Sequence, residues 1–339
     1  MGGGITLVFL ETSFVKPYLL PATFPYLAHF RSEMFHECST REFEFPTSGC
    51  LPRRNSEDRL ASQNYPRSVS RNPEVLTIIS WNTNHRNTSW EALSHFDADI
   101  ALLQEVTKAG VPEASEIQVV PPPTANWRIQ HYGSSATAVA VLNPELEFRP
   151  VPSVGFGLGS PNSVVSTHLG QFSVVRGQLG NKKTYFVSLY GIIENDYADG
   201  SVHRAISDLT PLIEQGAEVL IGADLNAFRG YSISGKQIAV ERHKNLFDRL
   251  EVLGLTCVGP FSTTGPLSNC PCNNPASCDH VQTHRHMNKE TSRAFQNDYI
   301  FATAELKSRL ISCRALTDQS PELWELSDHA PIEARISLR

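Results

Sequence analysis

From residue 75 to the C-terminus, short apolar runs alternate with turn-forming residues. Apolar runs of roughly four to eight residues, bounded by Gly, Pro, Asn or Asp, are typical of buried strands. Apolar residues at helical spacing predict two helices, around 202–213 and 246–253. Many strands with few helices favour a β-rich α/β sandwich. We predict strands over 75–81, 100–104, 127–132, 136–142, 163–168, 172–176, 184–190, 219–223, 281–286, 299–302 and 332–336.

Residues 1–72 differ in composition from the rest of the chain. Prolines and charged residues interrupt their apolar first part, which argues against a secretory signal. From Pro46 to Pro73 the chain is rich in Pro, Ser, Arg and Asn, a composition typical of flexible linkers. We therefore predict a flexible N-terminal extension over 1–72 and one folded domain over 73–339.

The charge of the chain is concentrated in the predicted domain. The net charge is −6, and residues 1–72 contribute eight basic and seven acidic residues, against 21 basic and 28 acidic residues in the remainder. An acidic domain excludes a strongly basic surface as the main source of affinity for nucleic acid. A local basic rim from Arg176, Arg285, Lys182 and Lys183 could offset this charge, although a solvated hairpin turn is the favoured interpretation of the two lysines.

The sequence also limits where the protein works. No apolar run approaches the roughly 20 residues that span a bilayer, so we expect no stable membrane insertion. Seven cysteines among 339 residues are too few for a disulfide-built scaffold. We expect an intracellular, cytoplasmic protein, and the sequence indicates no protein partner.

Polar side chains stand at the ends of several predicted strands. Each has an ordinary explanation as a turn former, but five strand ends with the same chemistry favour a common site. These residues are Asn82 and Asn84 after the first strand, Glu105 after the second, Asp224 and Asn226 after 219–223, Asp298 before 299–302, and Asp328 and His329 before the last strand.

The chemistry of these residues suits a metal-dependent hydrolase. Glu105, Asp224 and Asp328 would repel one another and need a cation or a proton if they were grouped. Oxygen ligands favour Mg²⁺ or Mn²⁺ over zinc. His329 beside Asp298 could hold one tautomer and act as an acid–base group. The predicted reaction is attack of an activated water on a phosphate ester.

Five segments carry a family resemblance through their order along the chain. They are Ser80-Trp81-Asn82, Leu103-Gln104-Glu105, Gly222-Ala223-Asp224-Leu225-Asn226, Asn297-Asp298-Tyr299 and Ser327-Asp328-His329-Ala330-Pro331. In this order they resemble the endonuclease/exonuclease/phosphatase superfamily, over about residues 74–339. The resemblance implies a four-layer α/β/β/α sandwich of two mainly antiparallel sheets, the DNase I-like fold.

The resemblance also implies the metal ligands. Glu105 would be the main ligand of Mg²⁺ or Mn²⁺, with Asn82 beside it, and Asp328 would belong to the same site. Asn84 stands where some members have a second metal-site carboxylate, and we also consider it as a phosphate contact.

The remaining catalytic roles follow from the same resemblance. Asp224 would orient or deprotonate the attacking water, and Asn226 would hold the phosphate. His329 would contact the scissile phosphate, positioned by Asp298. Tyr190, at the end of the strand 184–190, is similar to a tyrosine of the abasic-site endonuclease branch, where DNase I itself, many phosphatases and sphingomyelinases have a histidine.

These features predict a divalent-metal-dependent phosphodiesterase, a DNA endonuclease or exonuclease. The branch with a tyrosine at position 190 also has an asparagine three positions later, where this chain has Ile193. The substrate therefore stays open. The alternative is a phosphatase that uses the same site on a small-molecule or lipid phosphate.

A Cys/His-rich insert over 270–286 lies between two of the strand-end acids. Its spacing is that of a candidate structural Zn²⁺ site, and a disulfide or three loop thiols are the alternatives. The candidate ligands are Cys270, Cys272, Cys278 and His280. The residues that follow could present Arg285 or the histidines, His284 and His286, to a phosphate, or form an exposed polar strand. The insert resembles a bacterial-type subgroup of the superfamily.

Overall fold

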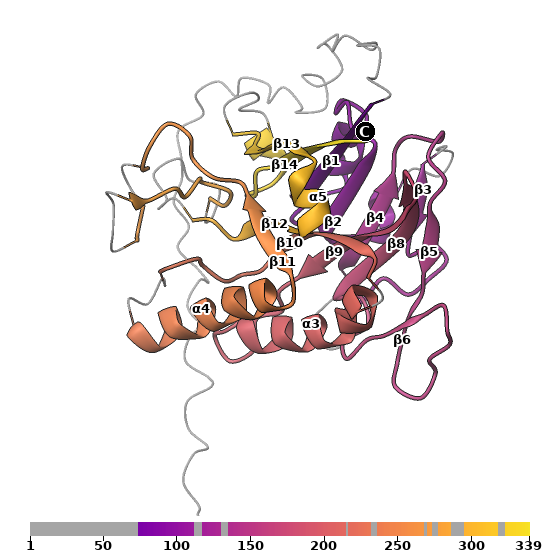
Figure 1. The fold of residues 1–339 in the computed structure, drawn as a ribbon, viewed down its shortest axis with the longest axis horizontal. Helices are drawn as coiled ribbons and strands as arrows, with labels where there is room; N and C mark the ends of the chain where they lie inside the picture. Colours follow the sequence, from indigo (N-terminus) through magenta and orange to yellow (C-terminus); the bar gives the residue numbers. More distant parts are fainter. Residues whose placement is uncertain are drawn as a thin grey trace, which may run out of the picture. The chain divides into compact units, whose positions relative to one another are not determined.

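The computed structural model describes residues 74–111, 117–129, 135–214, 216–231, 236–267, 270–272, 277–285, 295–317 and 323–339. The predicted extension over 1–72 and the candidate phosphate contact His286 lie outside these ranges. The described residues form two six-stranded sheets and a two-stranded ribbon, with helices on the outside (Figure 1).

The first sheet, sheet A, joins the two ends of the described chain. Its single parallel pair, β1 with β2, lies near the centre, and its other neighbours are antiparallel. In spatial order its strands are β13 (Leu310–Ala315), β14 (Ile332–Ser337), β1 (Val75–Asn82), β2 (Ile100–Val106), β4 (Ala136–Val141) and β3 (Gln118–Val120).

The second sheet, sheet B, repeats this plan with one central parallel pair, β9 with β10. A separate parallel ribbon pairs β6 (Ser153–Val154) with β7 (Val164–Val165). In spatial order the strands of sheet B are β11 (Leu255–Gly259), β12 (Asp298–Thr303), β10 (Glu218–Asp224), β9 (Lys182–Tyr190), β8 (Phe172–Leu179) and β5 (Arg149–Val151).

The two sheets pack face to face, with β1 against β10 and β2 against β9. Strands covered on both faces are apolar throughout rather than alternating, which explains the uninterrupted runs in β2 and β10. Ile78, Leu102, Phe186 and Leu220 are fully buried in the layer between the sheets.

Two long helices cover the outer face of sheet B, side by side (Figure 1). They are α3 (Asp199–Glu214) and α4 (Gln237–Val252), and their apolar faces share one core with the sheet. No helix among the described residues is both long and apolar enough to span a bilayer. The shorter helices are α2 (Thr88–Leu93), η1 (Lys108–Gly110), α5 (Ala304–Ser308) and α6 (Leu323–Leu326).

A group of buried polar residues, Ser80, Gln104 and Ser188, lies between the two sheets and forms a polar seam. Gln104 Nε2 donates to Ser188 Oγ at 3.0 Å and to the Gly222 carbonyl at 3.2 Å. An added Cβ at Gly222 would lie 2.6 Å from Ser80 Oγ, so the backbones approach closely here. The seam ties the two sheets together beside the strand ends Asn82 and Asp224, where the polar residues gather.

The predicted sandwich of two mainly antiparallel sheets is confirmed, but two predicted strands are wrong in the described residues. Residues 127–129 form no strand, because the Trp127 indole N–H turns back to the Pro122 carbonyl at 3.0 Å. Residues 281–285 contribute only isolated bridges, at His284. This segment bonds to Phe295 on one side and to Asp328 on the other, which interrupts a regular ladder.

Candidate active site

Strand register brings the predicted polar residues to one rim of the sandwich. In sheet A, Asn82 lies opposite Gln104 on parallel strands. In sheet B, Asp224 lies opposite Tyr190 on one side and Asp298 on the other. The Asn82 carboxamide Nδ2 donates to Asp224 Oδ2 at 2.8 Å, which joins the ends of the two sheets.

The backbone at this rim adopts conformations that side chains rarely take. Asn84, His85, Glu105 and Asn226 all have positive φ angles, between 47° and 58°. At Glu105 the strand also bulges, because its register with β4 shifts between Leu103 and Val106. Strained backbone of this kind costs free energy and concentrates at functional sites.

Asp224 is the most enclosed acid of the rim, with 1% of its surface exposed. Its Oδ1 accepts the backbone N–H of Asn226 at 2.9 Å, and Asn82 donates to its Oδ2. Burial raises the pKa of Asp224 to about 7, and the neighbouring carboxylates of Asp298 and Glu105 act in the same direction. Such a carboxyl group can exchange a proton near neutral pH.

His329 and Asp298 form a buried pair. The imidazole Nδ1 donates to both Asp298 oxygens, at 2.9 and 3.1 Å, because a carboxylate can only accept. The other nitrogen, Nε2, lies 3.9 Å from Asp224 Oδ2. Burial opposes the imidazolium, but the charges of Asp298 and Asp224 prevail and raise the pKa of His329 to about 10. His329 is therefore protonated at neutral pH.

Glu105 is held by two neighbours. His85 Nε2 lies 3.0 Å from Glu105 Oε2, and the Tyr190 hydroxyl also bonds to this carboxylate. Burial favours the neutral acid, yet these hydrogen bonds lower the pKa of Glu105. The same contact raises the pKa of His85, and burial together with the charge of Glu105 raises the pKa of Tyr190. Glu105 is thus an ionised carboxylate at the rim.

His284, which the sequence analysis did not assign to the site, stacks on His329. The ring centroids lie 4.4 Å apart with 26° between the ring planes. His284 Nε2 lies 3.7 Å from Asp328 Oδ2. Burial opposes ionisation of Asp328, but its contact with His284 lowers the pKa of the carboxyl. Asp328 is therefore linked to His329 through the ring of His284, which contacts both residues.

Two groups of side chains at the rim have the spacing of metal ligands. Asp224, Asp298 and His329 form one group, and His284, Asp328 and His329 form the other. Within each group the ligand atoms lie within 4.8 Å of one another. Glu105 adds a further carboxylate, whose charge acts on both Asp224 and His85.

The remaining predicted phosphate contacts lie in different surroundings. The Asn84 backbone N–H donates to Asn82 Oδ1 at 2.9 Å, which places Asn84 directly at the rim. The Arg285 guanidinium stacks over the Trp324 ring, 4.1 Å from its centroid, and its backbone N–H donates to the Asp328 carbonyl. Arg285 is therefore packed beside the site.

The basic residues of β8 and β9 do not lie at the rim, and the exposed Lys182 and Lys183 fit the solvated turn. Lys182 and Lys183 begin β9, whereas the site residue Tyr190 ends it. Arg176 lies opposite Tyr185, near the same distal end. At about 3.3 Å per residue, Lys183 lies more than about 20 Å along the strand from Tyr190. A strand pattern identifies the strand but not which of its ends meets the site.

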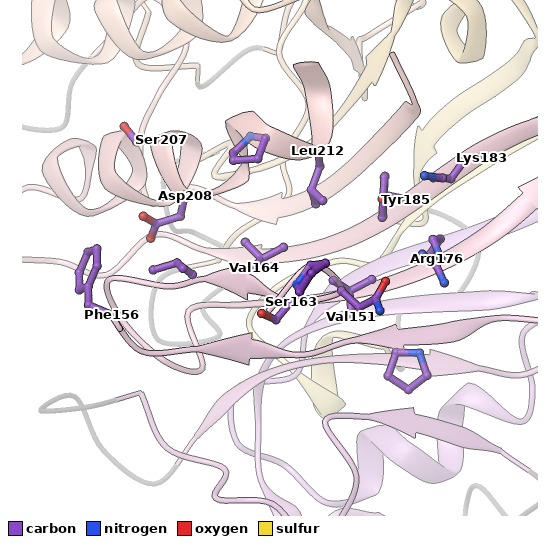
Figure 2. A pocket seen from close by; sticks show the side chains of 15 residues that line it. Val151, Phe156, Ser163, Val164, Arg176, Lys183, Tyr185, Ser207, Asp208 and Leu212 are labelled. Atoms are coloured by element: carbon purple, nitrogen blue, oxygen red, sulfur yellow. The ribbon is translucent and has the colours of Figure 1, made fainter. Parts of the chain in front are cut away.

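A pocket of about 500 Å³ lies at that distal end, between α3 and the β6–β7 ribbon (Figure 2). Arg176, Lys183, Tyr185 and Asp208 are among its lining residues. Asp208 accepts hydrogen bonds from the backbone and hydroxyl of Thr167. The pocket shares no residue with the rim described above, which remains the candidate site.

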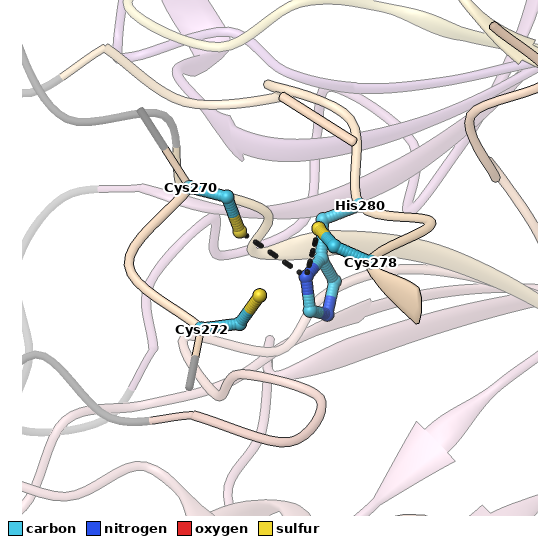
Figure 3. A group of neighbouring side chains, drawn as sticks. All are labelled: Cys270, Cys272, Cys278 and His280. Carbon is cyan, nitrogen blue, oxygen red and sulfur yellow. Dashed lines mark hydrogen bonds between the residues drawn. The ribbon is translucent and has the colours of Figure 1, made fainter. Parts of the chain in front are cut away.

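The four predicted zinc ligands lie together (Figure 3). The Nδ1 atom of His280 is 3.3 Å from the Sγ atoms of both Cys270 and Cys278. All three thiols, including that of Cys272, are free of disulfides. The cluster is separate from the acidic rim and has different ligand chemistry.

One rim histidine, His85, was not predicted from the sequence. It stands three positions after Asn82, in the same turn as Asn84, so its place at a strand end was a usable signal. His284 was considered only as one of the histidines of the insert, and its stacking on His329 and its contact with Asp328 place it at the rim. For such loop contacts the sequence carries no periodic signal.

Comparison with known proteins agrees with the observed architecture. No protein-family model matches the chain, and no curated protein matches it significantly. Among solved structures, it is similar to the endonuclease domain of TRAS1, a telomere-specific non-LTR retrotransposon, with 18% identity and a TM-score of 0.52 over 78% of this chain and 99% of that one. It is also similar to the Xenopus laevis APE2 catalytic domain, with 17% identity and a TM-score of 0.52 over 77% of this chain and 92% of that one. The third similar structure is the AP endonuclease LMAP from Leishmania major, with 14% identity and a TM-score of 0.51 over 78% of this chain and 88% of that one. The chain therefore has the DNase I-like sandwich fold that these proteins share.

Proposed function

We propose that this protein is a divalent-metal-dependent phosphodiesterase that hydrolyses DNA. The observation that carries the proposal is the hydrogen bond between Asn82 and Asp224, which joins the ends of the two sheets at one rim. That rim also holds the ionised Glu105 and the protonated pair of His329 with Asp298. Carboxylates and an imidazolium around one small area are the chemistry that phosphate ester hydrolysis needs.

The metal of this proposal is Mg²⁺ or Mn²⁺, held by Glu105 with Asn82 and Asp328. The donor set supports this choice, because carboxylate and amide oxygens are ligands that hard cations prefer. The lowered pKa values of Glu105 and Asp328 keep both groups in the ligating form. When bound, the ion would neutralise charge on the phosphoryl oxygens.

The chain's own residues would then handle the protons and the orientation of the water. Asp224 is fixed by Asn82 and by the Asn226 backbone, and its pKa of about 7 suits it to accept a proton from water. His329 is held by Asp298 with Nε2 free to donate to a phosphate oxygen. The Asn226 carboxamide bonds to the Gly191 carbonyl and to the Tyr190 hydroxyl, which fixes it for contact with the phosphate.

DNA is the favoured substrate for two reasons. The solved structures with the same fold include proteins named as an endonuclease domain and as an AP endonuclease. Tyr190 stands at the end of the central strand where the resemblance places a histidine in many phosphatases. Both observations favour the abasic-site endonuclease branch over most phosphatase branches.

A small or lipid phosphate is the second candidate, and the charge distribution favours it. The lysines of β9 and Arg176 are remote from the rim, and Arg285 is stacked on Trp324. A long polyanion would gain little from them, because non-specific affinity for DNA comes mainly from basic contacts to phosphates. A small phosphate would need only the rim itself.

A substrate panel distinguishes these two candidates. The purified full-length chain is incubated with an abasic-site duplex, an intact duplex, a p-nitrophenyl diester and p-nitrophenyl phosphate. Mg²⁺ is either added or omitted, and no chelator is used, so that any zinc at the cysteines is left in place. We expect Mg²⁺-dependent cleavage of a DNA substrate. Hydrolysis of the monoester alone would reject the nuclease proposal in favour of the phosphatase.

A further inference from the structure

The cysteine cluster has the geometry of a preformed metal site. Cys270, Cys272, Cys278 and His280 direct their ligand atoms toward one point (Figure 3), and all four atoms lie within 4.8 Å of one another. A tetrahedral zinc ion with Zn–S near 2.3 Å and Zn–N near 2.0 Å separates S from N by about 3.5 Å. The two observed S···N separations are both 3.3 Å.

The surroundings of the cluster prepare these atoms for a cation. His280 Nε2 donates to the Arg229 carbonyl at 2.7 Å, which leaves the lone pair of Nδ1 facing the sulfurs. The backbone N–H groups of Cys272 and His280 donate to the sulfurs of Cys270 and Cys278. Such N–H donors stabilise thiolate ligands. The bond from His280 Nε2 to Arg229 is made away from the sulfurs, so the imidazole orientation is an observation separate from the sulfur positions, and it points to the same ligand.

We propose that these four side chains bind one structural Zn²⁺, and that this ion holds the segment 277–285 against the catalytic rim. The zinc site is separate from the proposed phosphodiesterase centre and does not depend on that function. Three thiolates with one imidazole are a closed ligand set of the kind found in structural sites, with no open position for a substrate.

The link to the rim is a short run of backbone after His280. Three residues later, the buried Thr283 Oγ1 accepts the backbone N–H groups of Asn297 and Asp298, at 3.1 and 3.2 Å. The Thr283 carbonyl accepts the Ala330 N–H at 2.8 Å, directly after His329. A zinc-fixed His280 would thus fix the segment that positions both members of the Asp298–His329 pair.

The first test is the zinc content of the full-length protein, measured by plasma mass spectrometry after purification without chelators. We expect one zinc per chain in the wild type and in Cys313→Ser, whose cysteine lies in β13 outside the cluster. We expect less than about a tenth of that in Cys272→Ser and Cys278→Ser, since loss of one thiolate removes a ligand from a four-coordinate site. Equal zinc in all four proteins would overturn the proposal.

Cobalt substitution supports the test if a cysteine variant fails to fold. Wild-type protein reconstituted with Co²⁺ should show the visible absorption of a tetrahedral ion and a thiolate charge-transfer band. Octahedral cobalt spectra, or a disulfide among the three cysteines in freshly purified protein, would contradict the assignment. Both readouts are independent of catalytic activity.

Hydrogen exchange tests the positioning role. A zinc-selective chelator is added at constant Mg²⁺, and exchange is followed by mass spectrometry. We expect residues 281–285 and 295–298 to exchange at least about tenfold faster without zinc, because local opening no longer breaks the metal site. Strand β1 serves as the internal control and should not change. Unchanged exchange in both segments after proven zinc loss would overturn this role.

Discussion

At the scale of single residues, the site depends on how burial and charge are divided among neighbouring acids. Asp224 is buried beside other carboxylates and its pKa rises to about 7, whereas Glu105 is held ionised by His85 and Tyr190. His329 lies between Asp298 and Asp224 and stays protonated. The two carboxyl groups thus differ in protonation. Asp224 can accept a proton near neutral pH, whereas Glu105 stays ionised and suits a metal ligand.

Replacing Asp298 by Asn should lower kcat while leaving the KM for DNA nearly unchanged. The amide keeps the shape but removes the charge that holds His329 protonated, and acid–base groups contribute on the order of 10²-fold or more to a rate. Steady-state kinetics on the cleaved duplex measures the effect. The matched control is Asp208→Asn, in the distal pocket, and we expect it to keep wild-type kcat. Equal kcat values for both variants would contradict the role given to Asp298.

The free energy of unfolding should fall as the pH rises above neutrality, and His329 should cause part of this fall. Its folded-state pKa, about 10, exceeds its ordinary value of 6.5. The stabilisation is therefore complete below pH 6.5 and is lost as the pH rises toward 10. Between pH 7 and 8.5 the wild-type slope should exceed that of His329→Gln by up to about 1.4 kcal/mol per pH unit.

Urea denaturation without added Mg²⁺ measures both slopes. Asp224, with a pKa of about 7, still titrates at the lower end of this range, so the two slopes are compared from pH 8 to 8.5, where its own titration contributes little. Parallel slopes for the wild type and His329→Gln would show that the imidazole is not held protonated in the folded protein.

At the scale of secondary-structure elements, the parallel pairs β1–β2 and β9–β10 set the position of the site. Parallel strands end at the same edge, so Asn82 and Glu105 emerge together, as do Tyr190 and Asp224. The close approach at Gly222 allows the two pairs to meet.

Gly222→Ala should therefore destabilise the protein. The new Cβ would meet Ser80 Oγ at 2.6 Å and Leu102 Cδ1 at 2.8 Å, and overpacking of this kind costs roughly 1–3 kcal/mol. Urea denaturation provides the free energy of unfolding. Gly155→Ala is the control, because nothing lies within 4 Å of an added Cβ there and its φ is not positive. If both substitutions had the same small effect, the sheets would not be in the close contact described.

Strand ends were predictable from the sequence because an apolar run stops at a polar residue. Asp224 and Glu105 follow such runs directly, and the structure brings both to the rim. His284 was among the histidines of the insert considered as phosphate contacts, but its stacking against His329 was not predictable, because His284 lies in an irregular segment. For Lys182 and Lys183 a solvated turn was favoured and a phosphate contact stayed open, because hydrophobic periodicity carries no information on which end of a strand lies at the site.

At the scale of the whole molecule, the cations of β8 and β9 lie away from the site. The sequence from residue 73 onward has more acidic than basic residues, and the cations of β8 and β9 lie at the distal end of sheet B. Affinity for DNA would then come from the metal and from contacts at the rim. Electrostatic attraction over a broad basic surface would contribute little.

The double substitution Lys182→Gln with Lys183→Gln should leave the KM for DNA within about twofold of wild type at fixed ionic strength. Each phosphate contact that is lost lowers affinity and weakens its salt dependence, so a distal pair should change neither. Kinetics at two salt concentrations checks this. A several-fold rise in KM with a shallower salt dependence would place DNA at the distal end and contradict the assignment of the rim.

The most direct test of the account is the Mg²⁺ dependence of supercoiled-plasmid nicking and abasic-duplex cleavage by four proteins. They are the wild type, Asp224→Asn, His329→Ala and the distal control Asp208→Asn. We expect Mg²⁺-dependent cleavage by the wild type and the control, and a loss of activity of at least about 10²-fold in both rim variants. Full activity in a correctly folded Asp224→Asn or His329→Ala, or cleavage by the wild type without any divalent metal, would contradict it.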